Sequence, residues 1–408
     1  MKLTSAIVSG RLARVRAHTA AAGVDALVVT HLPNLQYLAG FSGSAGAAIL
    51  TPRACLLVVD FRYVTAATSL AATLDGLVRV ETVDRSYDEA IVKLLRREGP
   101  ARVGIEGAYL SVSRFNAISG ALAARSPLPV GPDVTPVLVP TERLVERARI
   151  IKDALEIAAL REGGRRLGRI AETVQAFVQA GRTERAVAAD IDAAIREAGF
   201  SKPAFETIVA SGPNSALPHA RPTDRRIEDG DPTVLDFGGV YDGYCVDLTR
   251  TVQLGAPSEA LARLYGAVAE AQQAAIEAVK PGVAASDVDA AARRVLDRHG
   301  LGDAFGHGTG HGLGLEVHEE PRIARPAPRV VDAVIEPGMV FTVEPGAYVP
   351  GVGGVRIEDD VLVTNSGCEI LTRQRERAQR VSHANGAGHG APASERVGGS
   401  GGAEPPGI

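Results

Sequence analysis

The sequence predicts two domains, an α/β domain followed by an α+β domain. Residues 1–126 alternate short apolar runs with helical patterns, which is typical of a mostly parallel sheet covered by helices. Five prolines between residues 127 and 140 end this alternation and indicate a linker. From Phe205 onward, apolar segments are joined by short turns, which favours antiparallel strands. A chain of 408 residues, 45% of them hydrophobic, is long enough for both domains.

In the first domain, residues 1–126, the apolar runs predict strands and the longer amphipathic segments predict helices. The strands are expected at residues 26–30, 47–50, 55–59, 77–83 and 103–105. The helices are expected near residues 12–22, 64–70 and 88–98.

The second domain is expected over residues 141–373 and begins with helices. A charged, alanine-rich helix should run from Glu142 towards Gly163. Further helices are expected near residues 182–198, 259–279 and 286–299, and strands at 339–345 and 355–363. Residues 374–408 are poor in large apolar side chains and rich in Gly, Ala, Pro and Ser, so we expect a disordered tail.

Residues 233–253 predict a β-hairpin whose register can be worked out. The Asp-Gly pair at 242–243 suits a two-residue turn. Gly238 then faces Asp247, so that Asp236 and Asp247 lie diagonally on one face, about 7–8 Å apart. Two carboxylates on the face of an apolar hairpin favour a shared cation, and a solvated face is the alternative.

Residues 306–318 contain three histidines interleaved with five glycines. Glycine at alternate positions costs a helix about 1 kcal/mol per residue, so a strand or open loop is expected. In a strand, His307, Thr309 and His311 would share one face, with glycine where another segment packs closely. Histidines this dense favour a functional site over core packing. The segment matches neither the dinucleotide-binding nor the P-loop phosphate signature.

Acidic residues at two predicted strands complete a candidate metal site. Glu344 ends the first strand, and Glu358 shares a face of the second with Arg356. The full set is Asp236, Asp247, His311, Glu344 and Glu358. Close carboxylates raise one another's pKa, so four of them need cations, and four negative charges balance two divalent ions. Oxygen ligands with one nitrogen suit Mn or Co, with Zn or Fe as alternatives.

At these residues the chain resembles the pita-bread metallopeptidases, in particular the branch of aminopeptidase P and prolidase. The matching segments of the second domain are residues 205–220, 234–251, 307–321, 343–346 and 355–359, and those of the first domain are 34–41 and 60–63. The resemblance implies a creatinase-like first domain and a pita-bread (creatinase/aminopeptidase-like) second domain. It also implies hydrolysis of the bond between an N-terminal residue and proline.

The resemblance assigns a role to each candidate residue. It implies that two metal ions are bound by Asp236, Asp247, His311, Glu344 and Glu358, with Asp247 and Glu358 bridging them. Glu344 would also be the general base. The substrate carbonyl and its oxyanion would be bound by His219, His307 and His318. Arg356 matches an arginine of the proline-specific branch that supports the acidic cluster.

The resemblance leaves several activities open. Release of the N-terminal residue from longer Xaa-Pro peptides, as by aminopeptidase P, is favoured by residues 41–46, 60–63 and 210–220. The alternative is an Xaa-Pro dipeptidase, with Arg62 or Arg221 binding the substrate carboxylate. A methionine aminopeptidase would not need the first domain, and a creatine amidinohydrolase would not keep the metal set. A non-catalytic pita-bread binding protein would have lost ligands.

Charge and cysteine content bear on partners and location. A net charge of −4 and a pI near 6.2 give no electrostatic reason to expect nucleic acid or an anionic membrane as a partner. The three cysteines, Cys55, Cys245 and Cys368, are too far apart in sequence for a disulfide framework and favour a reducing compartment. The first residues lack the apolar core of a signal peptide. We therefore expect a cytoplasmic protein and, from the resemblance, a homodimer.

Overall fold

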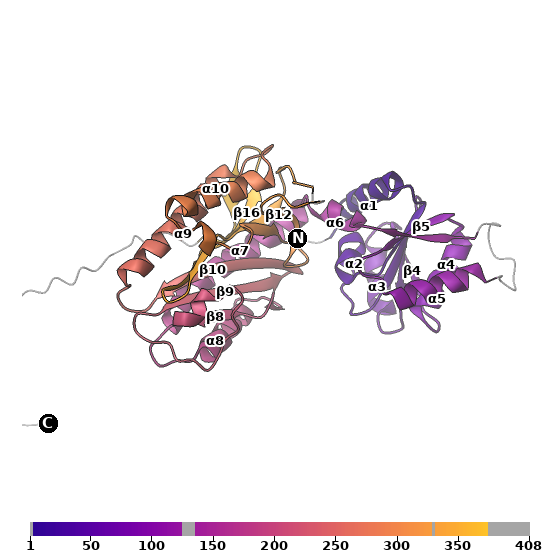
Figure 1. Ribbon diagram of the computed structural model, residues 1–408. Coiled ribbons are helices and arrows are strands. Elements are labelled where there is room, and N and C mark those ends of the chain that lie inside the picture. The colour runs from indigo at the N-terminus through magenta and orange to yellow at the C-terminus, as the bar shows by residue number, and fades with distance from the viewer. Residues whose placement is uncertain (1–2, 125–134, 329–330, 374–408) are drawn as a thin grey trace, which may run out of the picture. The chain divides into compact units, whose positions relative to one another are not determined.

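The computed structural model describes residues 3–124, 135–328 and 331–373 (Figure 1). The first part of the chain forms a six-stranded sheet with the strand order β4-β3-β2-β1-β5-β6. Its strands are β1 (Ala26–Val29), β2 (Ala47–Leu50), β3 (Cys55–Val59), β4 (Val78–Thr82), β5 (Arg102–Glu106) and β6 (Val137–Thr141). The pairs β3–β4, β1–β5 and β5–β6 are parallel, whereas β1–β2 and β2–β3 are antiparallel. The sheet is therefore mostly parallel, as predicted.

Helices pack on both faces of this sheet. One face is covered by α1 (Ser5–Ala21), α2 (Leu32–Ala39) and α3 (Val64–Ala72), and the other by α4 (Tyr87–Glu98) and α5 (Val112–Ala123). Two of these helices, α2 and α5, were not predicted. In α2, Pro33 reads as a helix breaker, but it lies in the first turn, where proline has no hydrogen bond to lose.

The structure corrects the predicted linker. Strand β6 lies largely within residues 127–140, yet it pairs with β5 as the edge strand of the first sheet. Pro140 suggested a break, but proline is tolerated in an edge strand. Residues 125–134 lie outside the described residues.

The helix predicted from Glu142 is two helices, α6 (Leu144–Arg149) and α7 (Ala154–Val174). Asp153 starts the second one, because its side chain accepts hydrogen bonds from the first turn and Glu156 completes a capping box. Helix α6 packs into the core of the first sheet. We therefore propose a domain boundary between α6 and α7.

The following residues form two larger sheets and a two-stranded one. The first sheet contains β7 (Lys202–Pro203), β8 (Ile208–Ser211), β9 (Pro232–Tyr241) and β10 (Tyr244–Gln253). The second has the order β12-β11-β13-β16-β17 and contains β11 (Gly310–Gly312), β12 (Glu319–Ile323), β13 (Val340–Val343), β16 (Asp359–Val363) and β17 (Cys368–Ile370). The short pair is β14 (Gly346–Val349) and β15 (Gly353–Arg356). This is the predicted α+β arrangement.

Two helix pairs enclose these strands. Helices α7 and α8 (Glu184–Glu197) pack against β9 and β10, whereas α9 (Glu259–Ala278) and α10 (Ala285–Arg298) pack against the second sheet. The single strand predicted over 355–363 is divided into β15 and β16, and Glu358 lies between them because its backbone N–H bonds to Thr249. The predicted tail lies outside the described residues. Among the described helices, none combines the length and the apolar character that a membrane span requires.

Candidate metal centre

The hairpin β9–β10 supplies two aspartates. Its register pairs Gly238 of β9 with Asp247 of β10, as predicted. Asp236 lies in β9, two residues before Gly238. The turn residues Asp242 and Gly243 have φ values of 48° and 86°, as a type I′ turn requires. The two aspartates are therefore diagonal neighbours on one face, which confirms the predicted geometry.

His311 is the middle residue of β11, and the glycines on either side of it are required by close packing. A Cβ atom at Gly310 would collide with the Thr342 carbonyl, and one at Gly312 would collide with the Glu320 carbonyl. This confirms that glycine occurs where another segment approaches closely.

The strand is shorter than predicted, because only residues 310–312 are extended in a ladder. The side chain of Thr309 is fully buried and bonds to Asp289, whereas His307 and His311 line a cavity. The prediction that these three side chains share a face is therefore wrong.

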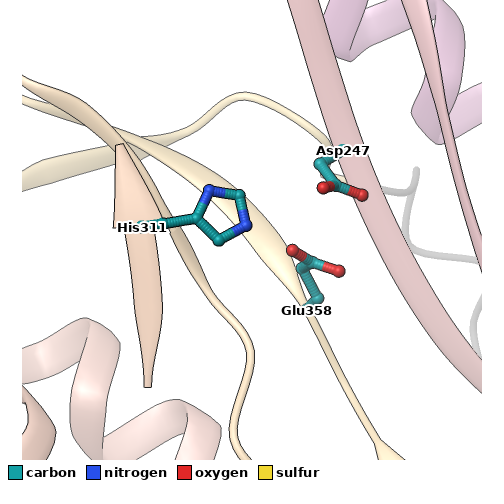
Figure 2. A group of neighbouring side chains, drawn as sticks. All are labelled: Asp247, His311 and Glu358. Atoms are coloured by element: carbon teal, nitrogen blue, oxygen red, sulfur yellow. The ribbon is translucent and has the colours of Figure 1, made fainter. Parts of the chain in front are cut away.

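Three of the candidate ligands form a tight cluster. Asp247, His311 and Glu358 each offer one ligand atom, and these atoms lie within 4.8 Å of one another (Figure 2). Glu344 adjoins the cluster, since its Oε1 lies 3.5 Å from Nε2 of His311. All five candidate ligands, including Asp236, line one cavity of about 350 Å³.

Burial changes the protonation of this cluster. Burial, followed by the charges of neighbouring carboxylates, raises the pKa of Asp247 and of Glu358 well above the ordinary range. Burial raises the pKa of Glu344 to about 8. Burial lowers the pKa of His311 to about 4, so its imidazole is neutral at pH 7. Buried carboxylates crowded beside a neutral imidazole are a donor set suited to divalent cations.

An unpaired oxygen supports this fit. Oδ1 of Asp247 is buried, and it has no hydrogen-bond partner among the described residues. Buried polar atoms in native proteins are nearly always paired, and an orphaned carboxylate oxygen is explained by an ion. The residues present therefore fit a divalent metal site.

The other predicted residues surround the same cavity. His219, His307, His318 and Arg356 all line it. Arg356 is buried, and its Nη2 donates to Asp236 at 2.5 Å. Its Nη1 donates to the Tyr348 hydroxyl at 2.7 Å. Arg356 thus supplies positive charge beside the acidic cluster, and all nine predicted residues meet at one site.

Sequence reasoning missed Arg322. This residue is the cross-strand neighbour of His311, it lines the cavity, and its side chain is exposed. Its guanidinium makes no ion pair or hydrogen bond with any described residue. The two arginines considered from the sequence, Arg62 and Arg221, do not line the cavity. Arg62 pairs with Asp60, and Arg221 lies near Glu206. The ladder between β11 and β12 shifts its register between His311 and Gly312, so the pairing of Arg322 with His311 could not be predicted from the sequence.

The chain is similar to known proteins over both of its domains. Residues 158–365 match the model of metallopeptidase family M24, and residues 11–151 match that of the creatinase/prolidase N-terminal domain. The Xaa-Pro dipeptidase of Pyrococcus horikoshii is 36% identical over 355 residues, which cover 86% of this chain and 93% of that protein.

Two solved structures are similar over most of their length. An Xaa-Pro dipeptidase from Bacillus anthracis is 35% identical with a TM-score of 0.83, over 90% of this chain and 98% of that chain. An X-Pro aminopeptidase from Thermotoga maritima is 34% identical with a TM-score of 0.76, over 86% of this chain and 96% of that chain.

Proposed function

Because the chain belongs to metallopeptidase family M24, with a creatinase-type N-terminal domain and a pita-bread C-terminal domain, we propose that it hydrolyses Xaa-Pro peptide bonds. The cavity that gathers all nine predicted residues carries this proposal. A methionine aminopeptidase would not account for the first domain. A non-catalytic binding protein would not account for a full set of ligand residues.

The metal set is the first part of the proposed mechanism. Two divalent ions, with Mn as first choice and Co, Zn or Fe as alternatives, would be held by Asp236, Asp247, His311, Glu344 and Glu358. When bound, such ions supply positive charge that polarises a peptide carbonyl and acidifies water. The Glu344 carboxylate would accept the proton of the attacking water and return it to the proline nitrogen, which leaves as a secondary amine.

Two histidines of the cavity would act on the carbonyl oxygen, and a third would position its neighbours. As this oxygen becomes negatively charged, hydrogen bonds from His219 and His318 would stabilise it. Burial lowers the pKa of His307 to about 4, so this imidazole is neutral. Its single N–H is on Nδ1, which donates to the Gly308 carbonyl at 2.8 Å, and its Nε2 accepts the Tyr348 hydroxyl at 3.0 Å. His307 therefore has no N–H left for the oxyanion and would instead orient the Tyr348 hydroxyl at the cavity wall.

Arg322 supports dipeptides as the preferred substrates. The relatives include both dipeptidases and an X-Pro aminopeptidase, so they do not confirm the preference for longer peptides expected from sequence. A dipeptide carries its carboxylate directly after proline, and a dipeptidase needs a cation there. The guanidinium of Arg322, which no other residue in the described part of the chain pairs with, would supply this cation at the cavity. Release from longer peptides is the second candidate, on the likeness to the Thermotoga maritima enzyme.

Substrate length and Arg322→Ala test this proposal together. We expect the wild-type protein to have a higher kcat/KM for an Xaa-Pro dipeptide than for the same dipeptide extended by two residues. Arg322→Ala should lower kcat/KM roughly ten- to hundredfold for the dipeptide, the usual range for a hydrogen bond to a charged group. The dipeptide amide, which has no carboxylate, should be little affected.

Arg221→Ala is the matched control, because it removes an exposed arginine outside the cavity. A wild-type preference for the longer peptide, unchanged in Arg322→Ala, would favour aminopeptidase P. Hydrolysis of neither peptide in the presence of Mn would refute the proposed activity itself.

A further inference from the structure

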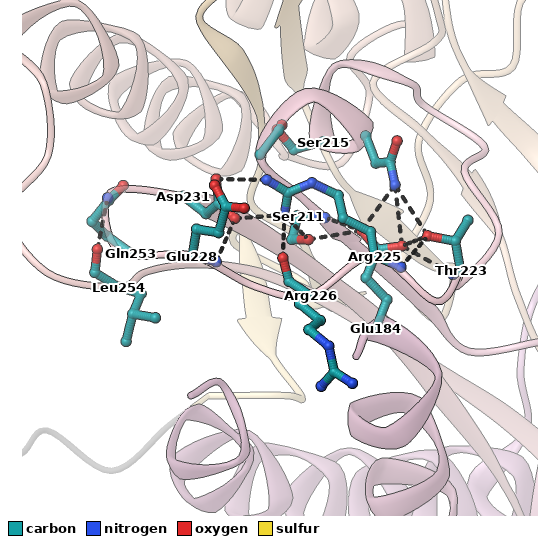
Figure 3. A network of polar contacts seen from close by, with 12 residues as sticks. Glu184, Ser211, Ser215, Thr223, Arg225, Arg226, Glu228, Asp231, Gln253 and Leu254 are labelled. Atoms are coloured by element: carbon teal, nitrogen blue, oxygen red, sulfur yellow. Dashed lines mark hydrogen bonds and ion pairs between the residues drawn. The ribbon is translucent and has the colours of Figure 1, made fainter. Parts of the chain in front are cut away.

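One buried carboxylate binds both ends of a loop through hydrogen bonds (Figure 3). This loop contains His219, which lines the metal cavity. The carboxylate belongs to Glu184, the first residue of α8, which is 0% exposed. Its Oε1 accepts the N–H and the hydroxyl of Ser211 at 2.7 and 2.8 Å. Its Oε2 accepts the N–H and the hydroxyl of Thr223 at 2.9 and 2.6 Å. These two residues flank residues 212–222, which we call the 212–222 loop.

The Glu184 carboxylate is fully engaged. The Asn214 amide, from within the loop, lies 3.0 and 3.1 Å from its two oxygens. A carboxylate has about four acceptor positions, so no position is left over. Burial raises the pKa of Glu184, but the hydrogen bonds from Thr223 and Ser211 outweigh it and the net pKa is lowered. The side chain is therefore an ionised anchor at neutral pH.

The opposite side of the loop contacts the cavity wall. The Ser215 hydroxyl accepts the N–H of Gly354 at 2.8 Å, and a Cβ atom at Gly354 would collide with the Ser215 carbonyl. The Pro218 carbonyl accepts Nη1 of Arg356 at 3.2 Å, and the same guanidinium binds Asp236. The loop therefore adjoins the metal cavity through a continuous series of hydrogen bonds.

Apolar packing contributes little to the position of this loop. Among the described residues of the loop, only Ala220 belongs to a buried hydrophobic cluster, and that cluster is small. Leu217, near the middle of the 212–222 loop, is 57% exposed. The conformation of the loop depends on its polar anchors.

We propose that Glu184 is a positioning residue, which holds the 212–222 loop so that His219 faces the substrate and the Pro218 carbonyl meets Arg356. Glu184 does not line the cavity, so it acts through the loop and not on the reacting atoms. The effect of Glu184 on catalysis rests on the proposed function, whereas its role in positioning the loop does not.

Glu184→Gln in the full-length protein tests this role. The amide keeps the size of the side chain but replaces one acceptor with a donor, which then opposes a backbone N–H of Ser211 or Thr223. We expect hydrogen exchange in residues 212–222 to become roughly tenfold faster or more. We expect metal content to match the wild type and kcat to fall roughly tenfold or more, with little change in KM.

Asp224→Asn is the matched control, because it makes the same chemical change one residue beyond Thr223. Asp224 is 78% exposed, and within the described ranges its side chain pairs only with Arg185, so exchange, metal content and kcat should all stay at wild-type values. Wild-type exchange over residues 212–222 in Glu184→Gln would overturn the proposal. Equal acceleration along the whole chain would overturn it too, since the effect would then be global.

Thr223→Val provides a second test if Glu184→Gln does not fold. It removes the 2.6 Å hydrogen bond to Oε2 but keeps the backbone N–H. It should accelerate exchange in the same residues, and unchanged exchange would contradict the proposal. Exchange and metal content are measured without substrate, so a wild-type protein inactive on Xaa-Pro peptides would refute the proposed function and leave this result intact.

Discussion

His311 and His318 have neighbouring rings, with centroids 4.4 Å apart, but their surroundings differ. His311 is largely buried and lies within reach of Asp247 and Glu358. The His318 side chain is exposed at the cavity wall. These two histidines therefore have different proposed roles, and replacing each one in turn separates the roles.

His318→Ala should leave metal content near the wild-type value and lower kcat. Loss of one hydrogen-bond donor to a developing oxyanion typically costs roughly 10²- to 10³-fold in rate. His311→Ala should instead lose metal, which elemental analysis of the purified variants measures. Equal metal loss in both variants would show that the two roles are wrongly assigned.

At the scale of elements, the turn of the β9–β10 hairpin fixes the relative position of Asp236 and Asp247. Gly243 in this turn has a φ of 86°, where a side chain is strained. Gly266 in α9 has no atom within 4 Å of the position its Cβ would take. A Cβ atom at Gly243 would also meet the flexible end of the Gln36 side chain, which has to move aside. The two glycines therefore allow the same substitution to be compared in a strained turn and in an open helix position.

Gly243→Ala should lower the free energy of unfolding by about 1–2 kcal/mol, because alanine in this conformation is strained. Gly266→Ala should raise it by up to about 1 kcal/mol, because alanine is the better helix former. Chemical denaturation of both variants gives the comparison. A neutral or stabilising Gly243→Ala would contradict the turn assigned to this hairpin.

Local patterns were predictable from the sequence, and long-range pairings were not. The hairpin register follows from an Asp-Gly turn between two apolar runs, and the structure confirms it. Strand β6 was missed because its proline is acceptable only at a sheet edge, which the sequence does not reveal. Arg322 was missed because it becomes a site residue only by pairing with His311 across a shifted ladder.

Across the whole molecule, the residues of the proposed metal set come from separate sheets. Asp236 and Asp247 come from the β9–β10 sheet, whereas His311 comes from the sheet that contains β13 and β16. Glu358 lies between two strands of different sheets. A bound ion would therefore connect elements that are distant in sequence. The cytoplasmic location and the homodimer stay predictions.

Metal binding should therefore stabilise the folded protein. An ion that binds only the folded state at one hundred times its Kd adds about 2.7 kcal/mol to the free energy of unfolding. The thermal midpoint should rise when Mn is added to chelator-treated protein. Asp247→Asn removes one ligand charge, so it should diminish this rise, and a midpoint unaffected by Mn in the wild type would contradict the site.

The most direct test of the account is the metal dependence of Xaa-Pro hydrolysis. Protein stripped with a chelator, and verified as metal-free, should lose activity on an Xaa-Pro dipeptide because its clustered carboxylates then lack their cations. Adding Mn or Co should restore activity, with a metal content approaching the two ions per chain proposed above. Undiminished hydrolysis by the metal-free protein would contradict the central claim that these five residues form a catalytic metal centre.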